Sequence, residues 1–139
     1  MKPERLFLAT TTLGLAFSLV LVLAACTQST TYERVARAMF PDGSMAMGGA
    51  GYLHVGIAGG LYAGWSLTLL LLARNKRLAR EPSLWGAIAS GLVLWFVLDS
   101  GASVLTGGIY NVVGNSLFFG LMLWPTLALR AQAANQNNS

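Results

Sequence analysis

The chain has 139 residues, of which 55% are hydrophobic and only 10% are charged, and its mean hydropathy is +0.59. A soluble domain carries about 25% charged residues, so this composition excludes an ordinary soluble domain and predicts an all-α, polytopic membrane protein whose main partner is the lipid bilayer. The formal net charge of +4 does not indicate nucleic-acid binding, because the basic residues lie at the ends of apolar runs, where they set orientation.

Four apolar runs follow one another along the chain, and each is long enough to cross a bilayer as a helix, which takes about 20 residues. The predicted spans are 6–26, 49–73, 84–105 and 108–129, within a single membrane domain 1–139. The basic segment between the second and third spans should be cytoplasmic by the positive-inside rule. The sequence therefore predicts a four-transmembrane-helix bundle in the bacterial inner membrane, with both termini cytoplasmic.

The first span begins after basic residues and ends in LAAC (23–26), which is typical of a bacterial lipoprotein signal. Processing there would leave a lipidated Cys26 and three spans. The apolar run is, however, longer than the roughly 7–15 residues of a signal peptide core, and Thr10, Gly14 and Ser18 form a row of small residues of the kind that packs helices in lipid. We expect a retained span, and cleavage with lipidation of Cys26 stays open as the alternative.

The loop 27–48 is predicted to lie outside and to contain a short amphipathic helix over 31–40. Thr30 and Glu33 have the spacing of a capping box, and Pro41-Asp42-Gly43 favours a turn after the helix. Two placements fit this segment equally, one in the membrane interface and one on the surface of the other helices.

The second span carries glycines at every fourth position, Gly56, Gly60 and Gly64, with Gly59 and Ala63 alongside. Such a row forms a groove that lets another helix backbone approach closely. We predict that the row containing Gly14 in the first span packs into it. A glycine-lined opening or a contact between subunits is the alternative use.

The third and fourth spans are separated only by Thr106 and Gly107, which predicts a tight antiparallel hairpin with its turn near the outer surface. Positions equally distant from residue 107 should lie at the same depth. The pairs that satisfy this rule are Asp99 with Asn115, Ser103 with Asn111, and Trp95 with Phe119. An ionised carboxylate within a span is expensive, so Asp99 should have hydrogen-bond donors around it or stay protonated.

His54 lies at a depth similar to that of Asp99 and Asn115, which predicts a polar cluster of these side chains. In one interpretation the cluster is polar glue that fixes the register of the hairpin. In the other it is an outward-facing site for a small polar ligand or a proton, with Asp99 as acceptor and His54 as proton-binding partner. The candidate residues for such a site are Asp99, His54, Asn115, Asn111 and Ser103.

The sequence contains no motif typical of catalysis, metal binding or phosphate binding, and Cys26 is its single cysteine. We therefore expect no enzymatic activity, no cofactor and no metal. The polar segment 131–139 is low in complexity and is predicted to be a mobile tail.

The last two spans contain W-x3-D-x3-S-x3-G, from Trp95 to Gly107, followed by N-x3-N at 111–115 and a late proline, Pro125. This pattern resembles one found in uncharacterised small four-span bacterial inner-membrane proteins. The resemblance implies the fold and the localisation, and it implies no activity.

Taken together, these features predict a non-catalytic integral membrane protein, either an accessory or assembly component of a larger membrane complex or a small homo-oligomer. The alternative function is a small-solute or proton-linked carrier or binder that uses Asp99 in a site open to the outer face.

Overall fold

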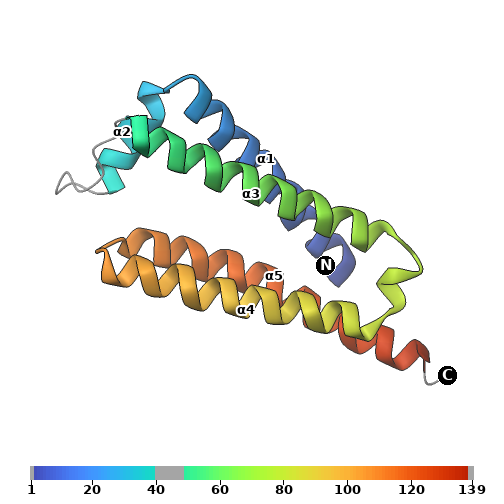
Figure 1. The fold of residues 1–139 in the computed structure, drawn as a ribbon. Coiled ribbons are helices and arrows are strands. Elements are labelled where there is room, and N and C mark those ends of the chain that lie inside the picture. Colours follow the sequence, from blue (N-terminus) through green and yellow to red (C-terminus); the bar gives the residue numbers. More distant parts are fainter. Residues whose placement is uncertain (1, 40–48, 138–139) are drawn as a thin grey trace. The chain divides into compact units, whose positions relative to one another are not determined.

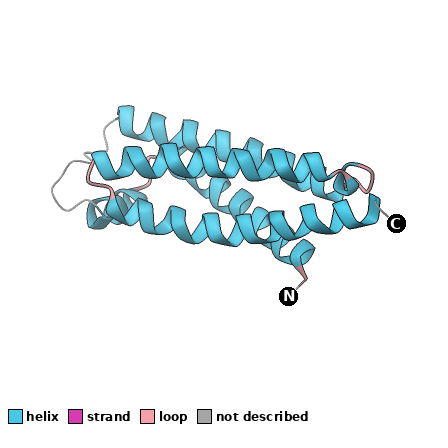
Figure 2. Cartoon of the chain, turned by 90° about the horizontal axis from the view of Figure 1, so that it is seen from below, coloured by secondary structure: helices cyan, strands magenta, loops and turns pink. Residues whose placement is uncertain are grey.

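A computed structural model describes residues 2–39 and 49–137. Its elements in chain order are α1 (Pro3–Cys26), α2 (Thr30–Met39), α3 (Gly49–Arg74), the 3₁₀ helix η1 (Leu78–Arg80), α4 (Pro82–Leu105) and α5 (Ile109–Asn137) (Figure 1). The described residues form helices joined by short connections and contain no strand (Figure 2). Four of the helices are long and apolar enough to cross a membrane, so the all-helical fold with four long apolar helices is confirmed.

The chain divides into two compact units that are described separately. The hairpin unit comprises Met1–Thr11 and Thr68–Ser139, and therefore the start of α1, the end of α3, η1, α4 and α5. The α2 unit comprises Thr12–Leu67 and contains the rest of α1, α2 and most of α3.

The apolar helices end near the predicted positions, with one exception. Helix α5 continues to Asn137, beyond the predicted end at residue 129. Residues 131–137 are thus helical instead of forming the expected mobile tail. Alanine and glutamine are good helix formers, and Ala133 is buried with 3% of its surface exposed. The prediction of a tail was based on the low-complexity composition of this segment and not on its helical propensity.

Helix α2 forms as predicted, but its N-cap is Ser29. The Tyr32 amide donates to the Ser29 hydroxyl at 3.3 Å, which is the usual cap geometry, whereas the Glu33 carboxylate pairs with Arg37 at 2.6 Å. The capping box predicted at Thr30 is therefore wrong by one residue. Burial raises the pKa of Tyr32 above its usual value. The turn predicted at 41–43 lies outside the described residues.

Within the α2 unit, α1 and α3 approach each other at Gly56 and Gly59. A Cβ atom built on Gly59 would lie 3.0 Å from the Ser18 carbonyl oxygen, and one on Gly56 would lie 3.3 Å from the Cβ of Ala25. A Cβ built on Gly60 or Gly64 would meet nothing within 4 Å. Of the predicted row, Gly56 therefore lies at the contact with α1, whereas Gly60 and Gly64 do not; the contact is completed by Gly59, which lies beside the row.

The basic link between α3 and α4 is held by local hydrogen bonds. The Asn75 Oδ1 atom accepts the amides of Arg77 and Leu78 at 3.1 and 3.2 Å. The Trp85 indole donates to the Ala79 carbonyl at 2.8 Å, which fastens η1 to the first turns of α4. These bonds give the link a defined backbone path at the basic end of the hairpin unit.

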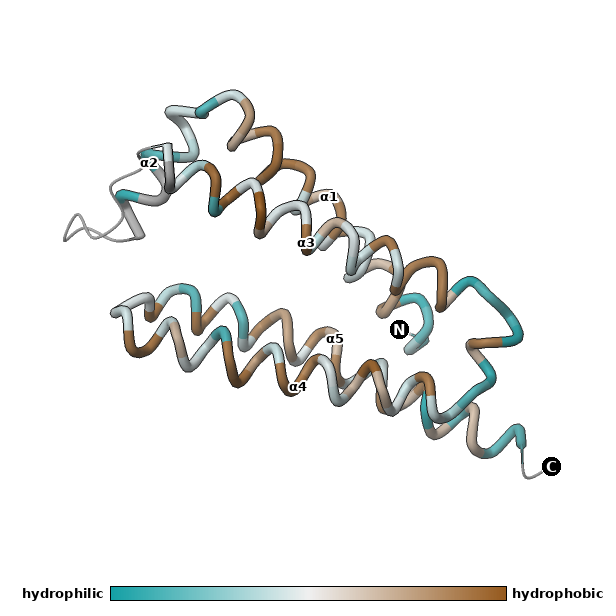
Figure 3. Tube along the Cα trace, viewed as in Figure 1, coloured by the Kyte–Doolittle hydropathy of each residue, from teal (hydrophilic) through white to brown (hydrophobic). Residues whose placement is uncertain are grey.

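Apolar side chains cover much of the outward surface of the long helices. Figure 3 shows hydrophobic residues along α1, α3, α4 and α5, with hydrophilic residues gathered at the α3–α4 link and at the end of α5. Leu105 is 88% exposed, Leu13 71% and Leu61 70%. Surfaces of this kind are unusual on soluble monomers.

Candidate functional site

The α4–α5 turn has the hydrogen bonds of a Schellman motif. The Gly108 amide donates to the Ser103 carbonyl at 2.7 Å, and the Gly107 amide donates to the Val104 carbonyl at 3.2 Å. Gly107 has φ +78°, the left-handed conformation that such a helix end requires. The turn fixes the register in which α5 returns along α4.

In that register two polar pairs join the helices, and both were predicted from the sequence. The Asn115 side-chain amide donates to the Asp99 carboxylate at 2.9 Å, and the Asn111 amide donates to the Ser103 hydroxyl at 2.8 Å. The structure thus brings together four of the five candidate site residues.

The polar pairs also bond to neighbouring groups of the same hairpin. Asn115 additionally contacts the Ser100 hydroxyl at 3.4 Å. The Ser103 hydroxyl accepts from Asn111 and donates to the Asp99 backbone carbonyl at 2.7 Å. Asn115 and Ser103 are buried, with 7% and 8% of their surfaces exposed. Three of these hydrogen bonds join α4 to α5, and that of Ser103 to the Asp99 carbonyl lies within α4.

The ring contacts of the hairpin lie one position away from Trp95 and Phe119, the two residues predicted to share a depth. Trp95 meets Phe118 edge to face, with ring centroids 5.7 Å apart, and Phe96 stacks on Phe119 at 4.5 Å. The rule of equal distance from residue 107 places backbones at one depth, but large rings extend along the helix axis and choose among neighbouring positions.

His54 belongs to a different unit from the polar pairs. It lies on α3 in the α2 unit with an exposed side chain, whereas Asp99 and Asn115 lie in the hairpin unit. The cluster of His54 with these two residues stays a prediction. Cys26, the candidate lipidation site, is a free and exposed thiol at the end of α1.

A second candidate site, which was not predicted from the sequence, lies at the basic end of the hairpin unit. A pocket there is lined by residues from five elements, among them Glu4, Lys76, Arg80, Trp85 and Gln132. The sequence analysis interpreted the basic residues only as orientation signals. Gln132 and Gln136, four residues apart, share a helix face, and this spacing was the available signal that the terminal segment contributes to a site.

The register of the hairpin should depend on Gly107. Replacing Gly107 with alanine is expected to lower the free energy of unfolding by about 1 kcal/mol, because a side chain is strained at positive φ. Gly101→Ala is the matched control. Gly101 lies inside α4 with nothing within 4 Å of a built Cβ, so this change should be neutral or slightly stabilising. Unfolding by SDS in mixed micelles, followed by circular dichroism, compares the two, and equal effects would contradict the assigned role of Gly107.

The chain matches no protein-family model, and comparisons with curated proteins and with solved structures found no similar protein.

Proposed function

We propose that this chain is a non-catalytic integral protein of the bacterial inner membrane that acts as an accessory or assembly component of a larger membrane complex, or as a small homo-oligomer. The observation that carries the non-catalytic assignment is the pairing of Asp99 with Asn115 and of Ser103 with Asn111 inside one hairpin. These bonds join neighbouring helices, which is the common use of polar residues in membrane helices.

The membrane location is supported by the exposed apolar faces and by the distribution of charge. Four helices have the length and composition of spans. In the hairpin unit, the start of α1, the α3–α4 link and the end of α5 surround one pocket, so their basic residues lie at the end opposite the α4–α5 turn. The positive-inside rule then places this end in the cytoplasm. The basic residues concerned are Lys2, Arg5, Arg74, Lys76, Arg77, Arg80 and Arg130.

The proposed association with a partner is supported by the surface of α3. Gly60 is exposed, and a Cβ built on it would meet nothing within 4 Å. Its neighbours on the helix, Ile57 and Leu61, are 52% and 70% exposed. A glycine beside large apolar side chains is suited to close packing with another membrane helix.

The alternative, a proton-linked or small-solute carrier, is supported by a single observation. Asp99 is only partly buried, and its carboxylate receives one hydrogen bond from the described side chains, at Oδ2. The second oxygen can accept a proton or a ligand. This function requires an ionisable group at position 99, whereas the structural role does not.

Asp99→Asn separates the two functions. The asparagine oxygen can still accept from Asn115, so a structural component should accumulate normally and lose less than about 1 kcal/mol of stability. Asp99→Leu, which removes the acceptor of a buried amide, should cost about 1–3 kcal/mol. Unfolding in mixed micelles measures both changes. If proteoliposomes holding the wild-type chain dissipate a pH or solute gradient, and Asp99→Asn abolishes that flux, the carrier function is correct instead.

The same preparation tests the proposed assembly. The chain purified from its native membrane in mild detergent should be found with a stoichiometric larger partner or as a homo-oligomer, and Asp99→Asn should leave that association unchanged. A monomer without partners would contradict the proposal. The intact mass also decides between a retained α1 and a chain that begins at a lipidated Cys26.

A further inference from the structure

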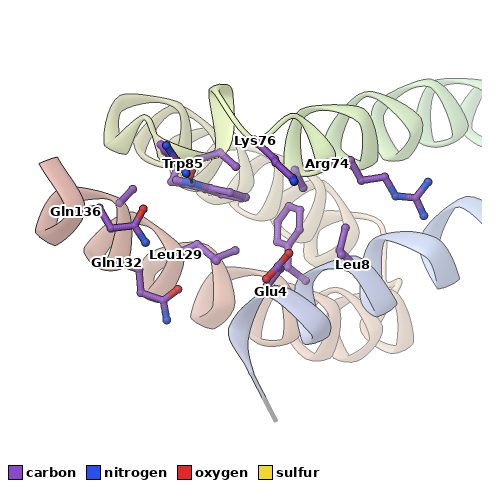
Figure 4. Close-up of a pocket in the computed structure, with 13 residues that line it drawn as sticks. Glu4, Leu8, Arg74, Lys76, Trp85, Leu129, Gln132 and Gln136 are labelled. Atoms are coloured by element: carbon purple, nitrogen blue, oxygen red, sulfur yellow. Dashed lines mark hydrogen bonds between the residues drawn. The ribbon is translucent and has the colours of Figure 1, made fainter.

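The basic end of the hairpin unit contains a pocket of about 360 Å³ (Figure 4). It lies where five segments meet, namely the start of α1, the end of α3, the link with η1, the start of α4 and the end of α5. None of the interactions assigned above to the α4–α5 hairpin uses this pocket. The lining residues that matter for its chemistry are Glu4, Arg74, Lys76, Arg80, Trp85 and Gln132.

The lining carries more positive than negative charge. The lining contains Arg74, Lys76 and Arg80 but a single carboxylate, that of Glu4. Among the described residues, the salt bridge found is that of Glu33 with Arg37 in α2, and none joins the three pocket cations to an acid. Figure 4 shows the Lys76 side chain directed toward Glu4 and the Arg74 guanidinium directed away from Trp85. With Arg74 directed away, Lys76 and Arg80 are the remaining cations of the lining.

Apolar groups form another part of the lining. Trp85 is 2% exposed and Phe7 is fully buried, and their rings meet edge to face with centroids 5.2 Å apart. These two rings are too buried to contact a ligand, so the accessible apolar lining is that of the half-buried Leu8 and Leu129. Gln132 adds a side-chain amide, which can donate to an oxygen anion. The pocket thus combines cationic and amide donors with an apolar wall, as an amphipathic anion requires.

The backbone that presents the cations is fixed by hydrogen bonds. Asn75 accepts the amides of Arg77 and Leu78 on one side of the link. On the other side, Trp85 donates to the Ala79 carbonyl at 2.8 Å and Asn137 donates to the Arg80 carbonyl at 3.5 Å. A site whose backbone is already ordered loses less conformational entropy when a ligand binds.

We infer that this pocket binds the phosphate group of an anionic phospholipid, with Lys76 and Arg80 at the phosphate oxygens and Leu8 and Leu129 against the apolar part of the lipid. The inference rests on the proposed membrane location. If the apolar helices span the bilayer, their basic end lies at the level of the lipid headgroups, where clustered Lys and Arg attract anionic lipids. Charge-assisted hydrogen bonds to phosphate are among the stronger polar contacts.

The test measures binding to the full chain in a neutral detergent by titration calorimetry. The probes are short-chain phosphatidylglycerol, phosphatidylcholine with the same chains, and inorganic phosphate. The pocket variant is Lys76→Gln with Arg80→Gln. Its matched control is Arg5→Gln with Arg77→Gln, which removes the same charge from residues that do not line the pocket. Helicity by circular dichroism verifies that both variants fold.

The wild-type chain and the control should bind phosphatidylglycerol with dissociation constants within about threefold of each other. The pocket variant should bind about thirtyfold more weakly, because it lacks two cations and the loss of each weakens binding by about tenfold or less. Equal weakening in the two variants would overturn the inference in favour of general surface charge. Equally tight binding of phosphatidylcholine would overturn it as well. Equally tight binding of inorganic phosphate would make the free anion the ligand and overturn the lipid assignment.

Failure of the membrane location is detected separately, by extraction of native membranes with alkaline carbonate. A chain that stays in the membrane pellet but does not prefer phosphatidylglycerol would overturn the pocket inference alone. A chain released by carbonate would overturn the proposed location, whatever the lipid titration gives.

Discussion

Replacing Trp85 with alanine is expected to lower the free energy of unfolding by about 3–5 kcal/mol, the usual loss for a large buried aromatic side chain. Trp85 is 2% exposed, and it joins two parts of the hairpin unit to α4. Its ring packs edge to face on Phe7 of α1 with centroids 5.2 Å apart, and its indole donates to Ala79 of the link. Alanine would remove both contacts and leave a cavity beside the basic link.

Two further variants separate packing from hydrogen bonding. Trp85→Phe keeps an aromatic ring but leaves the Ala79 carbonyl without the indole donor. It should lower the free energy of unfolding by about 1–2 kcal/mol, which is less than the loss expected for Trp85→Ala. Trp124→Ala is the control for the loss of an indole. Because Trp124 is 55% exposed, this change should lower the free energy of unfolding by less than about 1 kcal/mol. The measurement is SDS unfolding in mixed micelles, monitored by circular dichroism. Equal losses at positions 85 and 124 would show that Trp85 does not anchor the hairpin unit.

The parts of the fold that the sequence predicted well are those governed by local patterns. Apolar runs of span length gave the four long helices, because length and hydropathy are properties of single segments. The pairs Asp99–Asn115 and Ser103–Asn111 were also predictable, since a two-residue interruption leaves few registers for an antiparallel hairpin. Gly107, which has φ +78° at the turn, is part of that two-residue interruption.

The features that were not predicted depend on side-chain size or on distant contacts. Trp95 and Phe119 were predicted only to share a depth, and backbone register alone does not reveal that the Trp95 ring contacts Phe118. The pocket at the basic end is formed by five segments, and no single stretch of sequence carries its pattern. The terminal residues 131–137 were interpreted by composition, whereas the burial of Ala133 holds them in a helix.

The glycine row was right at Gly56 only, for a related reason. Spacing identifies which glycines share a face of α3, but it does not identify the face that meets α1. In the α2 unit that face includes Gly59, which the four-residue row omits, and the exposed side includes Gly60. Two adjacent glycines therefore have opposite environments, and this offers a direct experimental comparison.

Gly59→Leu is expected to lower the free energy of unfolding by about 3 kcal/mol, at the upper end of the losses caused by overpacking. A Cβ atom alone would lie 3.0 Å from the Ser18 carbonyl oxygen, the Leu21 Cβ and the Val22 Cγ2. The first of these is a backbone atom, so α1 as a whole would have to move away. Gly59→Ala adds only the Cβ, and it should lose less than leucine because alanine also favours the helix.

Gly60→Leu is the matched control, one residue further along the same helix. A Cβ built there would meet nothing within 4 Å, so the variant should unfold within about 0.5 kcal/mol of the wild type. If Gly60 instead contacts a partner helix in the membrane, Gly60→Leu should reduce co-purification of the partner while the isolated chain keeps its stability. Unfolding of the isolated chains in mixed micelles, with co-purification in parallel, distinguishes these effects. Equal destabilisation by the two leucine variants would contradict the crossing of α1 and α3 at Gly59.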